Sequence, residues 1–241
     1  MIIATLTGGP AQAHCYLVAA DGSTDAVAID PGWDATAILA QARSLDLTIK
    51  LILITHGHFD HIGAVTDLRE ATGAPVALHP READWLAVNG GADLFGVQIR
   101  SVAAPDLELT HGQIVAAGGL KFETRLVPGH TRGHVVFVEH AARSVFVGDV
   151  LFAGSIGRTD LPGGDYATLI ASLRDQLLTL PDEFKVYAGH GPPTTIGAER
   201  QFNPFFGMAH SQLDTLKFFQ AGVYGDETSS LARQKFPEVS N

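Results

Sequence analysis

The chain has 241 residues, a formal net charge of −10, 46% hydrophobic residues and 17% charged residues, which excludes an intrinsically disordered protein. The acidic balance and the lack of a basic run disfavour a nucleic acid as the partner, because phosphate contacts need clustered Lys and Arg. Cys15 is the only cysteine, so an intrachain disulfide is excluded. The sequence has no signal-peptide pattern and no long apolar run, and therefore predicts a cytoplasmic protein without membrane contact.

The first part of the chain alternates short strands with a helix. Runs rich in Ile, Val, Leu and Tyr predict strands at residues 2–7, 14–20, 25–29 and 51–54, and helical spacing of apolar residues predicts a helix over 35–46. The last strand is wholly apolar, which is typical of a strand buried on both faces.

A second series of strands and helices follows. The sequence predicts a helix over 63–72, a strand at 75–78, a helix over 81–88, an irregular stretch over 89–112, strands near 113–117, 120–127, 134–139 and 143–147, a helix over 166–180, a strand at 185–188 and a helix around 205–219. Alternation in two clusters indicates an α/β domain with sheets covered by helices. We expect one domain over residues 1–241, with a short C-terminal helical tail from about 200.

Residues that can bind metal ions are concentrated directly after the apolar strand, in His56-Gly57-His58-Phe59-Asp60-His61. In an extended chain alternate side chains point the same way, so His56 and His58 can bind one ion. A turn after Phe59 would direct Asp60 and His61 toward a second ion. Imidazole nitrogens and carboxylate oxygens suit zinc, iron or manganese. A cluster of surface histidines is the alternative interpretation, and the recurrence of such residues later in the chain disfavours it.

Three further ligand candidates each follow a predicted strand. His130 comes after the strand ending at Val127, Asp149 follows Gly148, and His190 follows Gly189. Open α/β sheets place their sites at the carboxyl ends of strands, so we expect these side chains to meet. The two oxygens of Asp149 could ligate two different ions.

Together these motifs resemble the metallo-β-lactamase superfamily over roughly residues 1–200. The resemblance implies a four-layer αβ/βα sandwich, in which two mixed sheets are flanked by helices. It also implies two divalent metal ions, zinc in the first place, with iron or manganese as alternatives. By this resemblance His56, His58 and His130 bind one ion, Asp60, His61 and His190 bind the other, and Asp149 bridges them.

Within the superfamily the chain is similar to small glyoxalase II-like hydrolases, on the segments 155–165, 189–200 and 203–205. This resemblance implies hydrolysis of a small anionic thioester of the hydroxyacylglutathione type by a metal-bound hydroxide, which Asp60 would orient as a catalytic residue. The chain departs from long glyoxalase II enzymes in lacking their Lys/Tyr pair for glutathione after Asp149. Pro192 replaces a tyrosine and His14 replaces the usual asparagine. The thiol carrier, the acyl group and the oligomeric state stay open.

Three more residues have two interpretations each. Asp30 follows a strand and could hydrogen-bond a metal-binding histidine or serve only a turn. His134 could contact the site or occupy a strand. Arg158 could bind a substrate carboxylate or form a salt bridge within its loop. Cys15 lies in an apolar strand and is expected to pack in the core, and the chain has no G-x-S-x-G motif for a serine nucleophile.

Rival functions use much of the same ligand set. Persulfide dioxygenases resemble this chain, share the sequence Gly157-Arg158-Thr159-Asp160, and use one iron held by the counterparts of His56, His130 and Asp149; the intact motif at 189–191 favours two metals instead. Lactone, ester or β-lactam hydrolysis needs the same core. RNA processing is disfavoured by the acidic charge. A non-catalytic binding module is disfavoured because seven unused ligands would leave unpaired polar groups in a pocket.

Overall fold

The structure, a computed structural model of the chain, describes residues 1–206. The polar tail and all but the first two residues of the helix expected around 205–219 lie outside the described residues. None of the helices in the described part is long and apolar enough to cross a membrane.

Two six-stranded sheets form the centre of the fold. In the first sheet β1, β2 and β3 are antiparallel, and β3 to β6 are parallel. In the second only β10 and β13 are parallel, so both sheets are mixed. The first consists of β1 (Ile2–Gly8), β2 (Ala13–Ala19), β3 (Asp25–Ile29), β4 (Thr48–Leu53), β5 (Val76–Leu78) and β6 (Leu107–Glu108). The second consists, in spatial order, of β14 (Thr194–Thr195), β13 (Lys185–Ala188), β10 (Ser144–Gly148), β9 (Val135–Glu139), β8 (Leu120–Leu126) and β7 (Ile114–Ala117). A separate hairpin pairs β11 (Leu151–Phe152) with β12 (Ser155–Ile156).

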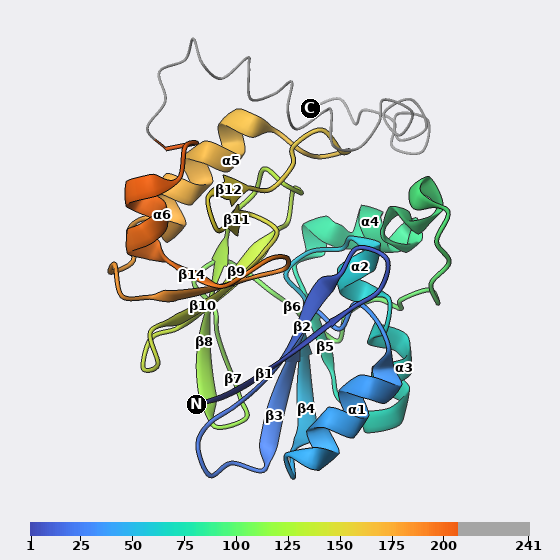
Figure 1. Cartoon of the computed structure of the whole chain (residues 1–241). Coiled ribbons are helices and arrows are strands. Elements are labelled where there is room, and N and C mark those ends of the chain that lie inside the picture. The colour runs from blue at the N-terminus through green and yellow to red at the C-terminus, as the bar shows by residue number, and fades with distance from the viewer. Residues whose placement is uncertain (207–241) are drawn as a thin grey trace.

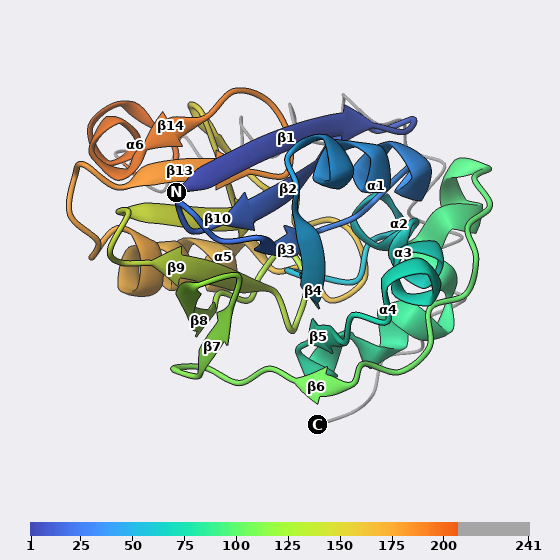
Figure 2. The same ribbon diagram turned by 90° about the horizontal axis from the view of Figure 1, so that it is seen from below.

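Helices cover the outer faces of both sheets, as Figures 1 and 2 show. The first sheet is covered by α1 (Ala35–Ser44) and α3 (Val65–Thr72). The second is covered by α5 (Tyr166–Ser172), its π-helical continuation η3 (Leu173–Leu177) and α6 (Ile196–Phe202). Aspartates begin two of these helices, because Asp34 accepts a hydrogen bond from the Ala37 amide and Asp165 accepts one from the Thr168 amide.

The alternation of side chains in β2 shows how the layers are built. Cys15 and Leu17 pack under α1 and α3, whereas Tyr16 and Val18 pack between the two sheets. Successive side chains of a strand point to opposite faces, so an apolar strand joins two cores. A third core lies between the second sheet and its helices. These three cores between four layers confirm the αβ/βα sandwich that the resemblance implied. Cys15 lies in the core, where burial raises the pKa of its thiol.

Local structure near the first ligand motif differs from the expectation. The helix expected over 63–72 is preceded by a separate helix, α2 (Phe59–Ile62), which carries Asp60 and His61. The stretch 89–112, expected to be irregular, contains η2 (Asn89–Phe95) and β6. Within η2 a Cβ on Gly90 would lie 2.3 Å from the amide nitrogen of Phe59, so only glycine permits this contact. The segment 81–88 forms the 3-10 turn η1 (Pro80–Glu82) and α4 (Ala83–Ala87).

Candidate metal centre

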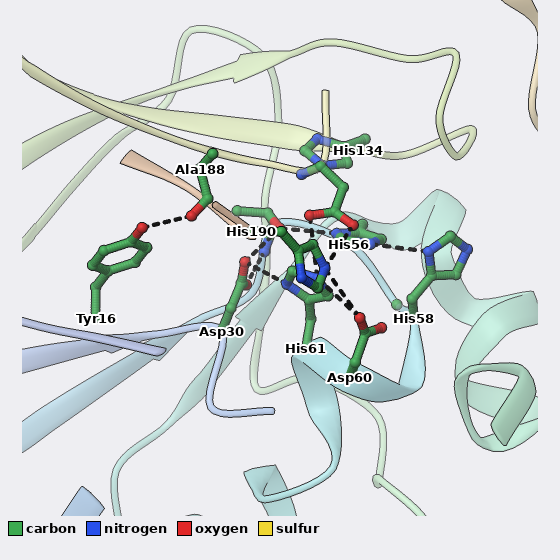
Figure 3. Close-up of polar contacts among 12 residues, drawn as sticks. Tyr16, Asp30, His56, His58, Asp60, His61, His134, Ala188 and His190 are labelled. Atoms are coloured by element: carbon green, nitrogen blue, oxygen red, sulfur yellow. Dashed lines mark hydrogen bonds and ion pairs between the residues drawn. The ribbon is translucent and has the colours of Figure 1, made fainter. Parts of the chain in front are cut away.

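Loops that follow four different strands bring the seven ligand candidates together, and Figure 3 shows several of them converging. His56 and His58 follow β4, and the next residue starts α2, which supplies Asp60 and His61. The other three candidates follow β8, β10 and β13. The side chains form two groups: His56, His58 and His130 in the first, and Asp60, His61, Asp149 and His190 in the second.

The first group consists of three buried imidazoles whose nitrogens face one another. His58 Nδ1 lies 3.0 Å from His56 Nε2 and 3.0 Å from His130 Nε2. Burial lowers the pKa of all three rings, and the neighbouring imidazoles lower those of His56 and His58 further. The rings are therefore neutral, and a neutral imidazole nitrogen is a metal ligand at about 2.0–2.1 Å from zinc. Three such nitrogens around one point suit a cation.

Hydrogen bonds on the far side of two of these rings direct their lone pairs toward that point. His130 Nδ1 donates to the backbone oxygen of Arg158 at 2.8 Å, so its Nε2 carries the lone pair. His56 Nδ1 lies 3.0 Å from Thr55 Oγ1, which itself donates to Asp30 at 2.7 Å and so accepts from His56. Fixing the tautomer in this way is what residues behind metal ligands do in known sites.

The second group combines two carboxylates with two imidazoles. His190 Nε2 lies 3.3 Å from Asp60 Oδ2 and 3.3 Å from Asp149 Oδ2. His61 Nε2 lies 3.7 Å from Asp60 Oδ2 and 3.3 Å from Asp149 Oδ1. Burial opposes protonation of both rings, but the carboxylates raise the pKa of His61 well above its ordinary value and that of His190 to about 10. When no metal ion balances the charge of the two carboxylates, the rings of His61 and His190 therefore favour their protonated forms.

Asp149 lies between the two groups. Its Oδ1 is 3.3 Å from His61 Nε2, and its Oδ2 is 3.3 Å from His190 Nε2 and 3.9 Å from His130 Nε2 in the first group. Burial raises the pKa of Asp149, but His190 and His61 outweigh burial and lower it well below its ordinary value. An ionised carboxylate whose Oδ2 lies between His190 and His130 can bridge two cations.

The residues fit a pair of divalent ions. His61 Nε2 and Asp149 Oδ1 are buried 3.3 Å apart, yet neither makes a well-aligned hydrogen bond in the described part of the chain, which is costly unless a ligand compensates them. A Cβ on Gly189 would lie 2.1 Å from Asp149 Oδ1 and 2.6 Å from His61 Cε1, so glycine keeps this space open. Nitrogen and carboxylate donors together suit zinc, iron or manganese.

Asp30 and His134 both contact the ligands. Asp30 Oδ2 accepts a hydrogen bond from His61 Nδ1 at 3.0 Å, and its carboxylate also accepts from the amide and the hydroxyl of Thr55, each at 2.7 Å. His134 stacks on His56 with ring centroids 4.7 Å apart, and its Nε2 accepts from the Asp149 amide at 3.1 Å. Each residue therefore supports a ligand from behind (Figure 3).

Arg158 lies beside the first group. Its guanidinium pairs with both oxygens of Asp160, at 2.7 and 2.6 Å, and its side chain is 17% exposed. The loop salt bridge therefore forms. The contact with a substrate carboxylate stays a prediction.

Two residues that the sequence did not single out, His14 and Tyr16, support the His190 loop. His14 Nε2 lies 2.9 Å from the backbone oxygen of Gly191, and the His14 amide donates to Gly189 at 2.8 Å. The Tyr16 hydroxyl donates to the backbone oxygen of Ala188 at 2.5 Å. The one sequence feature that pointed to His14 was its replacement of the usual asparagine. That replacement does not indicate a contact with a residue 177 positions away. Tyr16 gave none, because its ring packs in the apolar core.

The comparison with family models matches residues 8–190 to the metallo-beta-lactamase superfamily. A relative in Haemophilus influenzae, named hydroxyacylglutathione hydrolase GloC, is 42% identical over 197 residues, or 80% of this chain and 92% of the relative. A Bacillus subtilis protein, named probable metallo-hydrolase YqgX, is 41% identical and covers 82% of this chain and 93% of its own length.

Solved structures give the same result. The BLEG-1 B3 metallo-beta-lactamase superimposes with a TM-score of 0.81 at 41% identity, over 86% of this chain and all of that one. TTHA1623 in a di-iron-bound form gives 0.77 at 42% identity, over 84% and 99%. ETHE1 from Myxococcus xanthus gives 0.76 at 28% identity, over 98% of both chains.

The layered fold and the two groups of histidines and aspartates define a metallo-hydrolase. The chain belongs to the metallo-beta-lactamase superfamily.

Proposed function

We propose that this chain is a dinuclear metallohydrolase that cleaves small anionic thioesters of the hydroxyacylglutathione type. The observation that carries the proposal is the pair of ligand groups joined by Asp149. The di-iron form of TTHA1623 supports two ions, and the relative named hydroxyacylglutathione hydrolase supports the substrate class. Zinc is the first choice of metal, and iron or manganese would suit the same donors.

Bound divalent ions lower the pKa of water from about 15.7 to about 7 and so supply hydroxide at neutral pH. The chain's own contribution begins with Asp60 at the N-terminus of α2. Burial raises the pKa of Asp60, but His61 and a hydrogen bond from His190 lower it below its ordinary value. The carboxylate is therefore an acceptor at neutral pH, able to orient the attacking water through a hydrogen bond to its proton. No side-chain nucleophile is needed, and Cys15 is buried in the core.

Charge at the site favours an anionic substrate. Two divalent ions carry more positive charge than Asp60 and Asp149 neutralise, so the centre attracts anions although the chain's net charge is −10. Arg158, at the edge of the centre, would add a contact to a carboxylate of the substrate. We therefore propose a small anionic molecule as the substrate.

The test combines metal content with turnover. We would measure the metals in protein purified without added metal, and the hydrolysis of S-lactoylglutathione. About two ions per chain, with turnover abolished in His58→Ala and kept in a control His140→Ala on the exposed β9–β10 turn, would support the proposal. One tightly bound iron, no hydrolysis, and oxygen consumption with glutathione persulfide would overturn it in favour of a persulfide dioxygenase.

A second candidate is hydrolysis of lactones, other esters or β-lactams on the same metal core. The observation that favours it is the similarity to the BLEG-1 B3 metallo-beta-lactamase at 41% identity. A chromogenic cephalosporin and an acyl-homoserine lactone, assayed beside the thioester, separate the candidates. Two metals with β-lactam or lactone turnover and no thioester turnover would select this second candidate.

A further inference from the structure

Glu82 is a fully buried carboxylate that lies between two of the metal-ligand loops. It ends the 3-10 turn η1 and is 0% exposed. Its Oε2 accepts a hydrogen bond from the Gly57 amide at 2.8 Å, and its Oε1 accepts one from the Gly133 amide at 2.7 Å. These partners are 25 and 51 residues away in sequence, so the contacts are purely tertiary.

The two amides belong to the loops that carry the first ligand group. Gly57 stands between His56 and His58, and Gly133 follows His130 by three residues. One carboxylate therefore ties together the segments that supply all three imidazoles. A buried carboxylate is costly unless its oxygens are bonded, and Glu82 meets that requirement with one amide on each side.

The contact is close on both sides. A Cβ on Gly57 would lie 2.7 Å from Trp85 Cβ and 3.3 Å from Glu82 Oε2, and a Cβ on Gly133 would lie 2.9 Å from Glu82 Oε1. The ring of Trp85, in α4, meets His58 edge-on with centroids 4.4 Å apart. The Gly57 loop therefore packs against Glu82 of η1 and Trp85 of α4, and the Gly133 loop packs against Glu82 and Arg81 of η1.

We propose that Glu82 is a positioning residue for the first metal ion, setting the separation of the two loops so that the nitrogens of His56, His58 and His130 converge. The inference rests on the dinuclear centre of the proposed function. Glu82 touches no ligand atom, and it acts through the backbone. Within residues 1–206 its hydrogen bonds reach Gly57 and Gly133 in the loops of the first ligand group, and not Asp149 or His190, so its loss should weaken one ion more than the other.

Glu82→Gln tests the inference, because it keeps the size of the side chain and removes one acceptor. The amide nitrogen of glutamine would face a backbone N–H, so one loop loses its hydrogen bond. By competition with a zinc chelator we expect one ion bound as in the wild type and the other about 10–100-fold weaker. Cobalt substitution should show the changed coordination as an altered absorption spectrum at one of the two ions.

Glu199→Gln is the matched control. Glu199 is also a buried glutamate with both oxygens bonded, to the Thr194 hydroxyl at 2.7 Å and the Gly154 amide at 2.9 Å, and it contacts no ligand loop of the first group. We expect its cost in thermal stability to resemble that of Glu82→Gln, with wild-type zinc affinity at both ions. Equal weakening of zinc in both variants would overturn the specific role of Glu82.

Glu82→Asp is a second variant that carries the test if Glu82→Gln does not fold. It keeps the charge and is one methylene shorter, so it reaches only one loop, and we again expect one weakened ion. Wild-type zinc affinity in Glu82→Asp, or in a folded Glu82→Gln, would overturn the inference. A wild-type chain that binds no zinc, iron or manganese would instead overturn the metal centre itself.

Discussion

Asp30 and His61 form a buried pair in which Asp30 Oδ2 lies 3.0 Å from His61 Nδ1, with side chains 3% and 0% exposed. The same carboxylate binds the Thr55 hydroxyl, which accepts from His56 Nδ1. Asp30 thus orients one ligand of each group, directly for His61 and through Thr55 for His56. A single carboxylate at the end of β3 therefore fixes the tautomers of one ring in each ligand group.

Asp30→Asn should weaken both metal ions. The amide loses the charge and one acceptor, so either His61 or Thr55 loses its partner, and we expect about 10–100-fold lower zinc affinity by chelator competition. Asp34→Asn is the control, because Asp34 lies in the same loop and its side chain only caps α1. Unchanged zinc affinity in Asp30→Asn would contradict a role behind the metal ligands and leave Asp30 with a role in the turn after β3 alone.

His14→Ala should weaken the ion bound by His190. Without the imidazole the backbone oxygen of Gly191 loses its contact at 2.9 Å, and the loop carrying His190 is less firmly held. We expect roughly tenfold lower zinc affinity for one ion. His14→Asn should restore most of it, since an asparagine amide can donate to Gly191. Failure of asparagine to restore affinity, with alanine and asparagine equally weak, would contradict this role.

Arg158→Ala should raise the KM for an anionic thioester. Loss of a charged contact with the substrate carboxylate is expected to cost about 1.4 kcal/mol, a tenfold increase in KM, with kcat nearly unchanged. Arg143→Ala is the control, because Arg143 is exposed and, among residues 1–206, its guanidinium pairs with the exposed Glu183 at 3.4 Å. An unchanged KM with a lower melting temperature would contradict the substrate contact and leave Arg158 with a structural role.

Metal removal should make thermal stability depend on pH through His190. Burial opposes its protonation, but Asp149 and Asp60 raise the pKa of His190 from 6.5 to about 10. Because the pKa of His190 is higher in the folded chain than in the unfolded chain, protonation of His190 stabilises the folded chain. This stabilisation is complete below about pH 6.5 and is lost as the pH rises through about 10. The melting temperature of the chelated wild type should therefore approach that of chelated His190→Gln between pH 7 and 10.

The two outcomes of the pH experiment are distinct. A constant difference between the chelated wild type and chelated His190→Gln across this range would contradict the raised pKa. Added zinc should remove most of the pH dependence of the wild type, because the metal takes the place of the protons on the ligand rings.

Much of the fold and the ligand set was predictable from local pattern. The runs rich in apolar residues predicted strands at β2 and β4, and the wholly apolar run in β4 predicted burial on both faces, because side-chain direction in a strand follows from position alone. His56 and His58 were predicted to share an ion for the same reason. The ligands that follow β8, β10 and β13 were predicted to meet because strand ends in such sheets share an edge. The helix α2 was less predictable, since four residues give no periodicity.

The sequence by itself determined which residues could bind metal and at which strand ends they stand, because composition and period are local properties. Only the tertiary structure decided what holds them. Glu82 bonds an amide 51 residues away, His14 lies against a carbonyl 177 residues away, and Asp30 meets His61 at a separation of 31. These contacts depend on how the layers pack and how close glycine lets two backbones approach, and no local pattern encodes either.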